Sequence, residues 1–573
     1  MNKLQIFNNQ IVVTNQRGDT ETLDKLKLFY PVHSNRISTE HHISLSMLPE
    51  VLCTFRGLDE HNIDTAPLAV QTAFHKQIMK RQALDQLMKY GPTGSCVVNE
   101  HLTLDKHQQL GREISEAYDR FAFFYAVRTG KTPMALTIIN DDLKKHPNHK
   151  WLILCPLILI DNAWLEDAAK FFPEMKVVKC HASTKDKRLA QIQQQGNVYV
   201  LNTEAFVKWY DVLTQYHTFE GCFVDESSDI KSPKSNVSKA MVKVAPTIKR
   251  FYLLSGTPAP NGEWEYYTQM RCIDYYLMPP SYSQFKAFFF DNVSYNPQYE
   301  KLIIKQDKKP ILMDMIRKYA LFIDQEDVLD LPGREFIEYQ FDMPTDLKKH
   351  YNNMKSELYV ELGDMKVITK TAASKLNKLN QISSGFVIDT EAKQDNADFG
   401  TNKQEVYMLS TYRFEELFKL LSNPKCVGQQ VLIWANYHKE FEVIKQMMED
   451  KGLTCRCVYG LTPIAEKNEN IKLFKEGKIQ YLICNPASAD KGLTLTNAHI
   501  CIYFSLNWSY ELYIQSMNRI YGARRSQPKF CTYYIMEANK SVDVPLYQEV
   551  LQGKAKASYA ILNHLKPEKG GLT

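Results

Sequence analysis

The chain has 573 residues, of which 44% are hydrophobic and 24% are charged, with a formal net charge of +5. This length is too great for one hydrophobic core, so two or three domains are expected, and the composition excludes an intrinsically disordered protein. No uncharged stretch approaches the ~20 residues of a membrane span and the N-terminus lacks a signal-peptide pattern, so we expect no membrane partner and a cytoplasmic location. The mild positive charge permits a nucleic-acid partner but does not prove one.

The twelve cysteines are scattered, and no two have the C-x-x-C spacing of a zinc site. They are therefore expected to be reduced, mostly buried thiols, with neither a zinc site nor a disulfide framework. Residues 1–93 alternate short apolar patches with polar residues, have helical spacing from Phe74 to Tyr90, and carry no catalytic pattern. They are predicted to form a small α+β accessory domain, which ends in the turn-forming residues 91–95.

A candidate phosphate loop follows. The apolar run from Phe121 to Tyr125 has strand length, continues into Arg-Thr-Gly-Lys-Thr at 128–132, and precedes a helical segment. Strand, loop and helix N-terminus form an anion cradle in which Lys131 would reach the β and γ phosphates and Thr132 would hold Mg²⁺. Tyr125 stands where the full loop pattern expects glycine, and a bare Gly-Lys-Thr also occurs in ordinary turns, so both interpretations stay open here.

Further strand-length apolar runs alternate with helical segments, as expected for a parallel sheet covered on both faces. They begin at Trp151, Val198, Gly221 and Arg250. The third ends in Asp225-Glu226, where one carboxylate would bind Mg²⁺ and its neighbour would orient or deprotonate the attacking water. An isolated acidic pair more often caps a helix, but a pair about ninety residues after Gly-Lys-Thr favours the catalytic interpretation. The fourth run ends in Ser255-Gly-Thr-Pro, which alone is only a turn.

A second series of strands follows a predicted helical region at about 345–421. Its strand candidates begin at Val431, Cys455, Tyr481, Ile500 and Cys531. This series repeats the first without a phosphate loop, so it predicts a second lobe of the same α/β type.

Together these segments resemble, in order, the motifs of the superfamily 2 helicases and translocases, and within them the Swi/Snf-like ATPases, similar to bacteriophage-encoded members. The resemblance covers about Leu104 to Met536. It implies two RecA-like lobes in tandem, at 94–338 and 339–573, after the accessory domain. It also implies ATP and Mg²⁺ as ligands and Lys131, Asp225 and Glu226 as catalytic residues.

The resemblance assigns roles to further residues. Leu104-x-x-His-Gln108-x-x-Gly111 is similar to the adenine-recognising Q motif, with Gln108 as reader, and Arg128 stands where most members have glycine. The other nucleotide-binding residues are Thr129, Gly130, Lys131, Thr132 and Gly492. The nucleic-acid contacts are Pro156, Leu157, Asn202, Thr203, Trp434 and Thr494. The coupling residues are Ser228, which replaces the family's usual histidine, with Ser255, Thr257 and Gln515.

The arginine finger is the main departure from the family. Gln515 and Arg519 are four residues apart, so the sequence predicts that they share one helical face. The second family arginine would fall at position 522, which is Gly522, a residue expected to end the helix. Arg524 or Arg525 would then supply the missing guanidinium, or both would contact solvent or phosphate.

The function implied is a monomeric, ATP-dependent translocase on double-stranded or branched DNA, with little sequence preference because backbone contacts carry no sequence information. Two alternatives stay open: a nucleotide-gated DNA-binding module whose hydrolysis has decayed, and an RNA-directed helicase. A nuclease interpretation finds no further acidic or histidine cluster to support it.

Overall fold

The computed structural model describes residues 3–7, 10–14, 33–34, 40–56, 66–294, 300–365, 370–389, 405–488, 494–522 and 530–553. Over these ranges, no helix is long and apolar enough to cross a membrane. The chain falls into two compact units, with main segments Met1–Asn292 and Leu302–Leu329 in the first and Asp330–Ala557 in the second. Each unit is described by itself, and the three-domain division stays a prediction.

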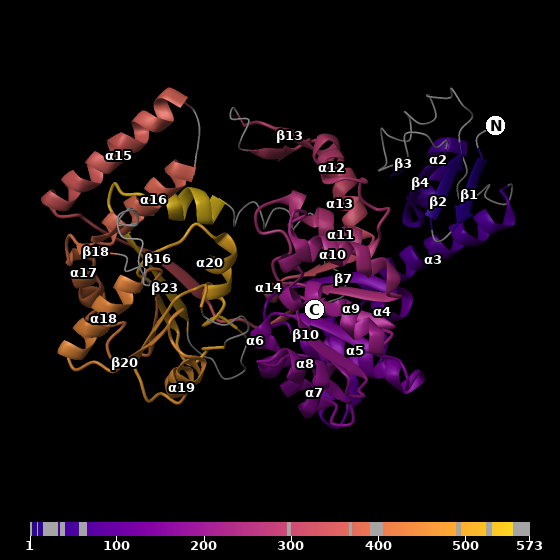
Figure 1. Cartoon of the computed structure of the whole chain (residues 1–573), viewed down its shortest axis with the longest axis horizontal. Helices are drawn as coiled ribbons and strands as arrows, with labels where there is room; N and C mark the ends of the chain where they lie inside the picture. Colours follow the sequence, from indigo (N-terminus) through magenta and orange to yellow (C-terminus); the bar gives the residue numbers. More distant parts are fainter. Residues whose placement is uncertain are drawn as a thin grey trace. The chain divides into compact units, whose positions relative to one another are not determined.

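The first unit is built on a seven-stranded sheet whose paired strands are all parallel (Figure 1). Its order is β15 (Ala320–Ile323), β7 (Arg120–Tyr125), β12 (Arg250–Leu254), β11 (Gly221–Asp225), β8 (Trp151–Cys155), β10 (Val198–Asn202) and β9 (Val177–Lys179). The five predicted strands are confirmed, while β9 and β15 at the two edges were not predicted.

Helices cover both faces of this sheet because its strands are apolar on both. One face packs on α4 (Lys106–Ala117), α5 (Lys131–Lys145) and α7 (Glu166–Phe171), and the other on α9 (Thr203–Tyr216), α10 (Asn236–Val244) and α11 (Tyr266–Ile273). On the first face Trp151 stacks on Phe223 with ring centroids 5.6 Å apart, and Phe223 stacks on Tyr252 at 4.9 Å. The first unit also contains several short elements: β5 (Val97–Asn99), β6 (Leu102–Thr103), α6 (Leu157–Leu159), α8 (Lys185–Ile192) and α14 (Gln325–Val328).

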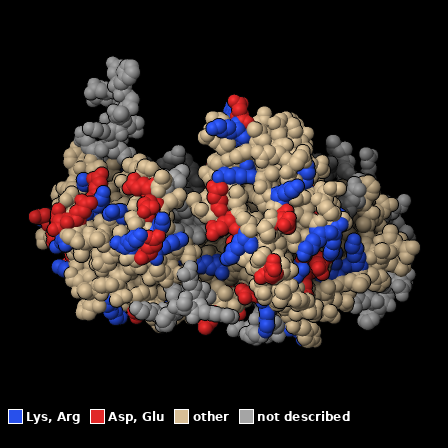
Figure 2. Space-filling view, turned by 90° about the horizontal axis from the view of Figure 1, so that it is seen from below, with Lys and Arg blue, Asp and Glu red and all other residues tan. Residues whose placement is uncertain are grey.

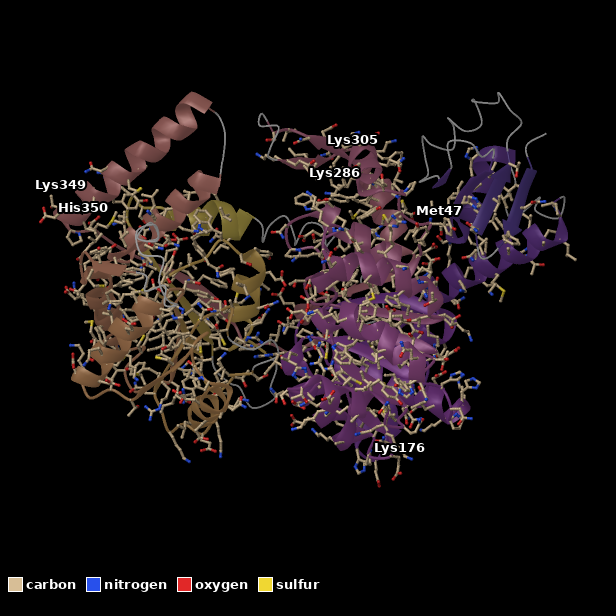
Figure 3. The ribbon with its side chains drawn as sticks, viewed as in Figure 1. Met47, Lys176, Lys286, Lys305, Lys349 and His350 are labelled. Atoms are coloured by element: carbon tan, nitrogen blue, oxygen red, sulfur yellow. The ribbon has the colours of Figure 1, made fainter. Side chains whose placement is uncertain are left out.

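The N-terminal elements share the core of the first unit. An antiparallel sheet of order β1 (Lys3–Phe7), β2 (Gln10–Thr14), β4 (Glu40–Ser44) and β3 (His33–Ser34) precedes α2 (Leu48–Arg56) and α3 (Leu68–Tyr90). Its buried side chains are continuous with one face of the large sheet. Glu50 also pairs with Lys318 at 2.7 Å, beside Met47 (Figure 3). Truncating this segment would therefore expose apolar surface of the first unit.

A hairpin projects from the first unit (Figure 1). It consists of β13 (Phe290–Asn292) and β14 (Leu302–Ile304), between α12 (Tyr282–Phe289) and α13 (Lys309–Arg317). Lys286 lies in α12 and Lys305 follows β14 (Figure 3), and Lys305 Nζ donates to the Ala287 carbonyl of α12 at 2.6 Å.

The second unit carries a six-stranded parallel sheet. Its order is β16 (Arg334–Phe341), β23 (Cys531–Ala538), β22 (Ile500–Tyr503), β19 (Val431–Trp434), β21 (Tyr481–Cys484) and β20 (Cys455–Val458). The other elements are α15 (Thr345–Met365), α16 (Lys370–Ser383), β17 (Phe386–Asp389), β18 (Glu405–Met408), α17 (Tyr412–Leu421), α18 (His438–Asp450), α19 (Ile464–Lys475), α20 (Tyr510–Met517) and α21 (Asp543–Pro545). Two parallel sheets flanked by helices confirm the predicted fold class of two α/β lobes in tandem.

Candidate nucleotide and nucleic-acid site

The predicted phosphate loop joins β7 to α5, as the sequence pattern indicated. Within it, Arg128 has φ 66° and Gly130 has φ 73°, both in the left-handed region. Glycine adopts this conformation without cost, whereas another residue loses about 1 kcal/mol or more. The backbone thus explains why glycine suits position 128 in the family, and it shows that Arg128 is held there under strain.

Buried polar side chains of α4 hold this loop. His107 Nε2 donates to the Thr129 carbonyl at 2.7 Å, and Gln108 Nε2 donates to the Thr129 and Gly130 carbonyls at 3.0 and 3.2 Å. Burial lowers the pKa of His107, which favours the neutral ring. A Cβ on Gly130 would lie 1.9 Å from Gln108 Nε2, so the loop and this amide are in direct contact.

The Gln108 amide also closes a capping box, because its Oε1 accepts from the Asp105 N–H at 2.8 Å. Adenine reading by Gln108 stays a prediction, and the structure adds a second task, support of the loop. Gly111 in the same motif is explained by packing, since a Cβ there would lie 2.3 Å from Met134 Sδ of α5.

Sequence reasoning missed Gln325, the first residue of α14. Its buried amide donates to the Val127 carbonyl, on the side of the loop nearer β15. Gln325 follows the apolar run Ala320–Ile323 after one residue, Asp324, and its side chain type gave no signal of this contact. The loop is therefore held by side chains from α4 and from α14.

Lys131 and Thr132 begin α5, so both lie at a helix N-terminus, where backbone N–H groups favour an anion. Lys131 Nζ donates to the carbonyls of Tyr125 and Ala126 at 3.0 and 3.1 Å. The same ammonium lies close enough to Asp225 to act on the pKa of that carboxyl. Because β7 and β11 both pair with β12, the predicted phosphate lysine and the predicted metal ligand lie at the same sheet edge.

Asp225 ends β11 and is only 4% exposed. Burial raises the pKa of Asp225, while Lys131 and hydrogen bonds from Trp164 and the Glu226 backbone act in the opposite direction. Trp164 Nε1 donates to Asp225 Oδ2 at 3.0 Å and the Glu226 N–H donates to Oδ1 at 3.0 Å. This contact of Trp164 with Asp225 was not predicted from the sequence.

The donor set at this edge fits Mg²⁺. Asp225 and Thr132 offer oxygen ligands, and Mg²⁺ typically takes one or two carboxylates together with substrate phosphates and water. This mode needs no all-protein cage, and no group of three or more His, Cys, Asp or Glu residues that could hold a metal occurs in the described ranges. Glu226, next to Asp225, has φ 53°, a strained conformation of the kind found at functional sites.

The predicted coupling residues of the first unit lie at the same edge. Ser228 is buried in the 3₁₀ turn Ser227–Ile230, directly after the acidic pair. Ser255 is fully buried and its Oγ accepts from the Thr257 N–H at 3.1 Å. Between them, Gly256 approaches the phosphate loop so closely that a Cβ would lie 3.0 Å from Val127.

The predicted nucleic-acid contacts of this unit follow neighbouring strands. Pro156 and Leu157 come after β8, Asn202 is the last residue of β10, where it pairs with Cys155, and Thr203 begins α9. Leu157 is 49% exposed, whereas Asn202 and Thr203 are largely buried at the N-terminus of α9. Since parallel strands end at one edge, the nucleotide residues and these four residues share that edge.

The predicted nucleic-acid and nucleotide residues of the second unit are only partly placed by the structure. Trp434 is fully buried in the core, so the prediction that its side chain contacts nucleic acid is corrected. Thr494 is half-buried, and the neighbouring Leu495 N–H donates to the Arg519 carbonyl at 2.9 Å, which joins the two predicted motifs. Gly492, Arg524 and Arg525 lie outside the described residues.

The prediction that Gln515 and Arg519 share one helical face is also corrected. Helix α20 ends at Met517, and the Arg519 N–H donates to the Ser516 carbonyl at 3.1 Å in a turn. The helix therefore stops before Gly522, and the Arg519 side chain is buried.

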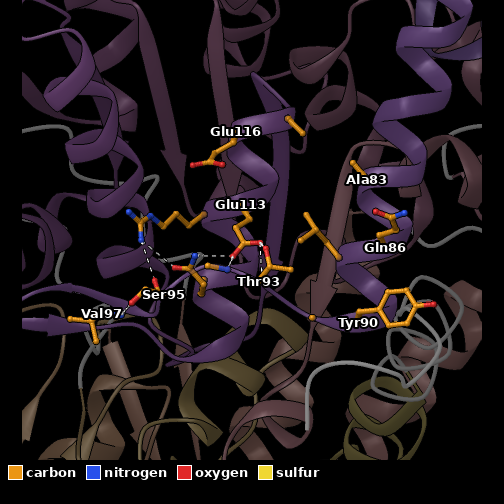
Figure 4. A pocket seen from close by; sticks show the side chains of 14 residues that line it. Ala83, Gln86, Tyr90, Thr93, Ser95, Val97, Glu113 and Glu116 are labelled. Carbon is orange, nitrogen blue, oxygen red and sulfur yellow. Dashed lines mark hydrogen bonds between the residues drawn. The ribbon is translucent and has the colours of Figure 1, made fainter.

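An open pocket of about 810 Å³ lies between α3 and α4 (Figure 4). Two of its charged side chains have partners: Glu113 accepts from the N–H groups of Thr93 and Gly94 at 3.0 and 2.7 Å, and Arg112 pairs with Asp141 at 2.6 Å. It lies beside the helix that carries Gln108, and we assign it no function.

Comparison with known proteins agrees with this arrangement. Residues 126–398 match the family described as SNF2-related domain, and residues 412–523 match the family described as helicase conserved C-terminal domain. A putative protein p41 from Acyrthosiphon pisum secondary endosymbiont phage 1 is 25% identical, over 70% of this chain and 84% of that protein. The human SWI/SNF-related matrix-associated actin-dependent regulator of chromatin subfamily A member 1 is 21% identical, over 70% of this chain and 38% of that protein.

Among solved structures, the Sulfolobus solfataricus SWI2/SNF2 ATPase core in complex with dsDNA has 17% identity and a TM-score of 0.36, over 81% of this chain and 97% of that chain. The chain spans less than half the length of the human relative that it matches. An SNF2-related domain followed by a helicase C-terminal domain identifies the chain as a member of the SNF2-related family of superfamily 2 ATPases.

Proposed function

We propose that this chain is a nucleic-acid-stimulated ATPase that translocates along double-stranded or branched DNA and remodels forks, junctions or bound proteins. The observation that carries the proposal is that Lys131 follows β7 while Asp225 ends β11, two strands on either side of β12 whose ends lie at one sheet edge, beside a strained phosphate loop. We also propose that it acts as a monomer in the cytoplasm.

The residues of the first unit divide the work of hydrolysis. Lys131 binds the β and γ phosphates of the substrate ATP, with the N–H groups at the start of α5. Thr132 and Asp225 would hold Mg²⁺, which when bound supplies charge neutralisation at the phosphates. Glu226 accepts a proton from the attacking water. Burial keeps competing water away from Asp225, which is 4% exposed.

Arginines of the second unit are proposed to stabilise the charge that develops on the γ-phosphate. Arg519 is the first candidate, with Arg524 or Arg525 as the second, and Gln515 would couple them to DNA. Such an arginine is worth about 10³-fold or more in turnover.

DNA would be gripped through its phosphates at the carboxyl edge of the first sheet, near Leu157 and Thr203. The human relative is named a regulator of chromatin, which supports DNA as the substrate. Lys and Arg are interspersed with Asp and Glu over the face drawn in Figure 2. We expect binding that is insensitive to base sequence and that falls steeply between about 50 and 200 mM salt.

A phosphate-release assay tests the proposal with duplex, forked and single-stranded DNA and with RNA as stimulators. We expect duplex or forked DNA to stimulate wild-type hydrolysis and Lys131→Ala to abolish it. Lys176→Ala is the matched control, because Lys176 is exposed and precedes β9 at the opposite edge of the sheet (Figure 3). If only RNA stimulates hydrolysis, the substrate is RNA and the DNA proposal is wrong. If the wild-type protein binds ATP and DNA without hydrolysis, the chain is a nucleotide-gated binding module and not an enzyme.

A further inference from the structure

A buried glutamine outside the predicted motifs joins the acidic turn to the Ser-Gly-Thr-Pro loop. Gln269 lies in α11 and is fully buried, as is Ser227, the residue after Glu226. Ser227 Oγ donates to Gln269 Oε1 at 2.7 Å. Gln269 Nε2 donates to the carbonyl of Pro258 at 2.7 Å and to that of Glu265 at 3.0 Å.

The three bonds fix the orientation of this amide. A primary amide has two N–H donors and an acceptor oxygen, and here both donors and the oxygen are used. Rotating the amide by 180° would set its oxygen against two carbonyl oxygens, which is unfavourable. The bridge therefore has one arrangement, in which the turn after Glu226 and the carbonyl of Pro258 are held at a fixed separation.

The bridge ends on residues with proposed tasks. Ser227 follows Glu226, whose backbone at φ 53° persists only where its surroundings hold it. Pro258 follows Thr257, and the preceding Gly256 approaches the phosphate loop at Val127. A movement of one loop relative to the other must therefore shift the Gln269 amide or break one of its hydrogen bonds.

We infer that Gln269 is a positioning residue, which holds Glu226 in its reactive conformation and keeps the acidic turn in register with the Ser-Gly-Thr-Pro loop. This inference rests on the proposed function, since it assigns a residue to the same hydrolysis. Gln269 touches neither the phosphates nor the metal site in this role, so it acts on turnover and leaves nucleotide binding largely unchanged.

The test compares Ser227→Ala, Gln269→Leu and their double variant with Ser238→Ala. Ser238 is a matched control, because its fully buried hydroxyl donates to the Ile230 carbonyl at 2.9 Å in the same region and does not belong to the bridge. Full-length proteins are assayed for kcat and KM for ATP, with thermal unfolding as the check on folding.

We expect Ser227→Ala to lower kcat about tenfold, which is about 1.4 kcal/mol in the barrier, with KM for ATP changed by less than about twofold. Gln269→Leu should lower kcat at least as far and the double variant no further, because both changes break one bridge. Ser238→Ala should lose thermal stability and keep wild-type kcat.

Two results overturn the inference alone. In the first, the wild type is active and the folded Ser227→Ala and Gln269→Leu variants keep its kcat. In the second, Ser238→Ala loses as much kcat as these two variants do. A wild-type protein without ATPase activity on any nucleic acid would overturn the proposed function and the inference with it.

Discussion

Replacing Gln108 by leucine separates two roles for this residue, reading adenine and supporting the phosphate loop. The variant removes two donated bonds, to Thr129 and Gly130, and one accepted bond, from Asp105. Thr129 keeps the bond from His107, and the Gly130 carbonyl keeps a longer one, 3.4 Å, from the Met134 N–H.

Because the loop carbonyls keep partners, the cost is smaller than the sum of three lost bonds. The Asp105 N–H loses its side-chain partner, so we expect a loss of about 1–2 kcal/mol in the free energy of unfolding. A loosened loop binds phosphates less well whatever the base, so KM should rise about tenfold for ATP and GTP alike, which is about 1.4 kcal/mol of binding. Gln108→Glu should be worse than Gln108→Leu, since it sets a second oxygen against the two carbonyls.

The assay is steady-state hydrolysis of ATP and of GTP, together with denaturant unfolding. Gln109→Leu is the matched control, because Gln109 is buried in the same helix and bonds to Glu113 and not to the loop. A rise in KM confined to ATP would refute the loop argument and restore adenine reading as the main role. An unchanged KM for both nucleotides would exclude both roles.

Three further predictions concern hydrolysis and stability. Glu226→Gln should bind ATP and fail to turn it over, because the base is lost and the metal ligand is kept; normal hydrolysis would refute Glu226 as base. Arg519→Ala and one of Arg524→Ala or Arg525→Ala should each lower kcat about 100-fold or more with ATP affinity little changed, and if neither later arginine matters, Arg519 acts alone. Burial raises the pKa of Glu537 to about 7, so this residue stabilises the fold in acid and the contribution falls as pH rises from about 4.5 to 7. The difference in unfolding free energy between Glu537→Gln and the wild type should therefore be more favourable to the variant at about pH 8 than at about pH 5. Denaturant titrations of both proteins at both pH values measure this difference.

The sequence predicted the strands that are apolar on both faces, because such runs are long and distinct. It missed β9, which has three residues, and β15, which has four, because such short runs carry little signal. It also missed β16, although Ile337, Tyr339 and Phe341 alternate there with polar residues. This alternation with a period of two is typical of a strand, but it was overlooked because the segment lies at the junction of the two predicted lobes.

Sequence patterns can indicate a site residue where chemistry fixes the residue type, and they cannot where packing decides. A phosphate loop needs lysine and a metal site needs a carboxylate, so Lys131 and Asp225 carry a signal in their own identity. The contact of Gln325 with Val127 joins residues 198 apart, and that of Trp164 with Asp225 joins residues 61 apart. A bond to a backbone carbonyl leaves no mark on the identity of its partner, so sequence patterns could not reveal the first.

Backbone strain and buried amides occur together at this site. Arg128, Glu226 and Lys540 are the non-glycine residues with positive φ in the described part of the chain, and the first two follow β7 and β11 at the proposed site. Strained conformations persist only where surrounding contacts over-determine them. The loop of Arg128 is bonded to the amides of Gln108 and Gln325, and the turn of Glu226 is bonded to that of Gln269. Glutamine amides from three different helices thus support the two turns in which catalysis is proposed. This support gives a physical reason why arginine is tolerated at position 128, where the family mostly has glycine.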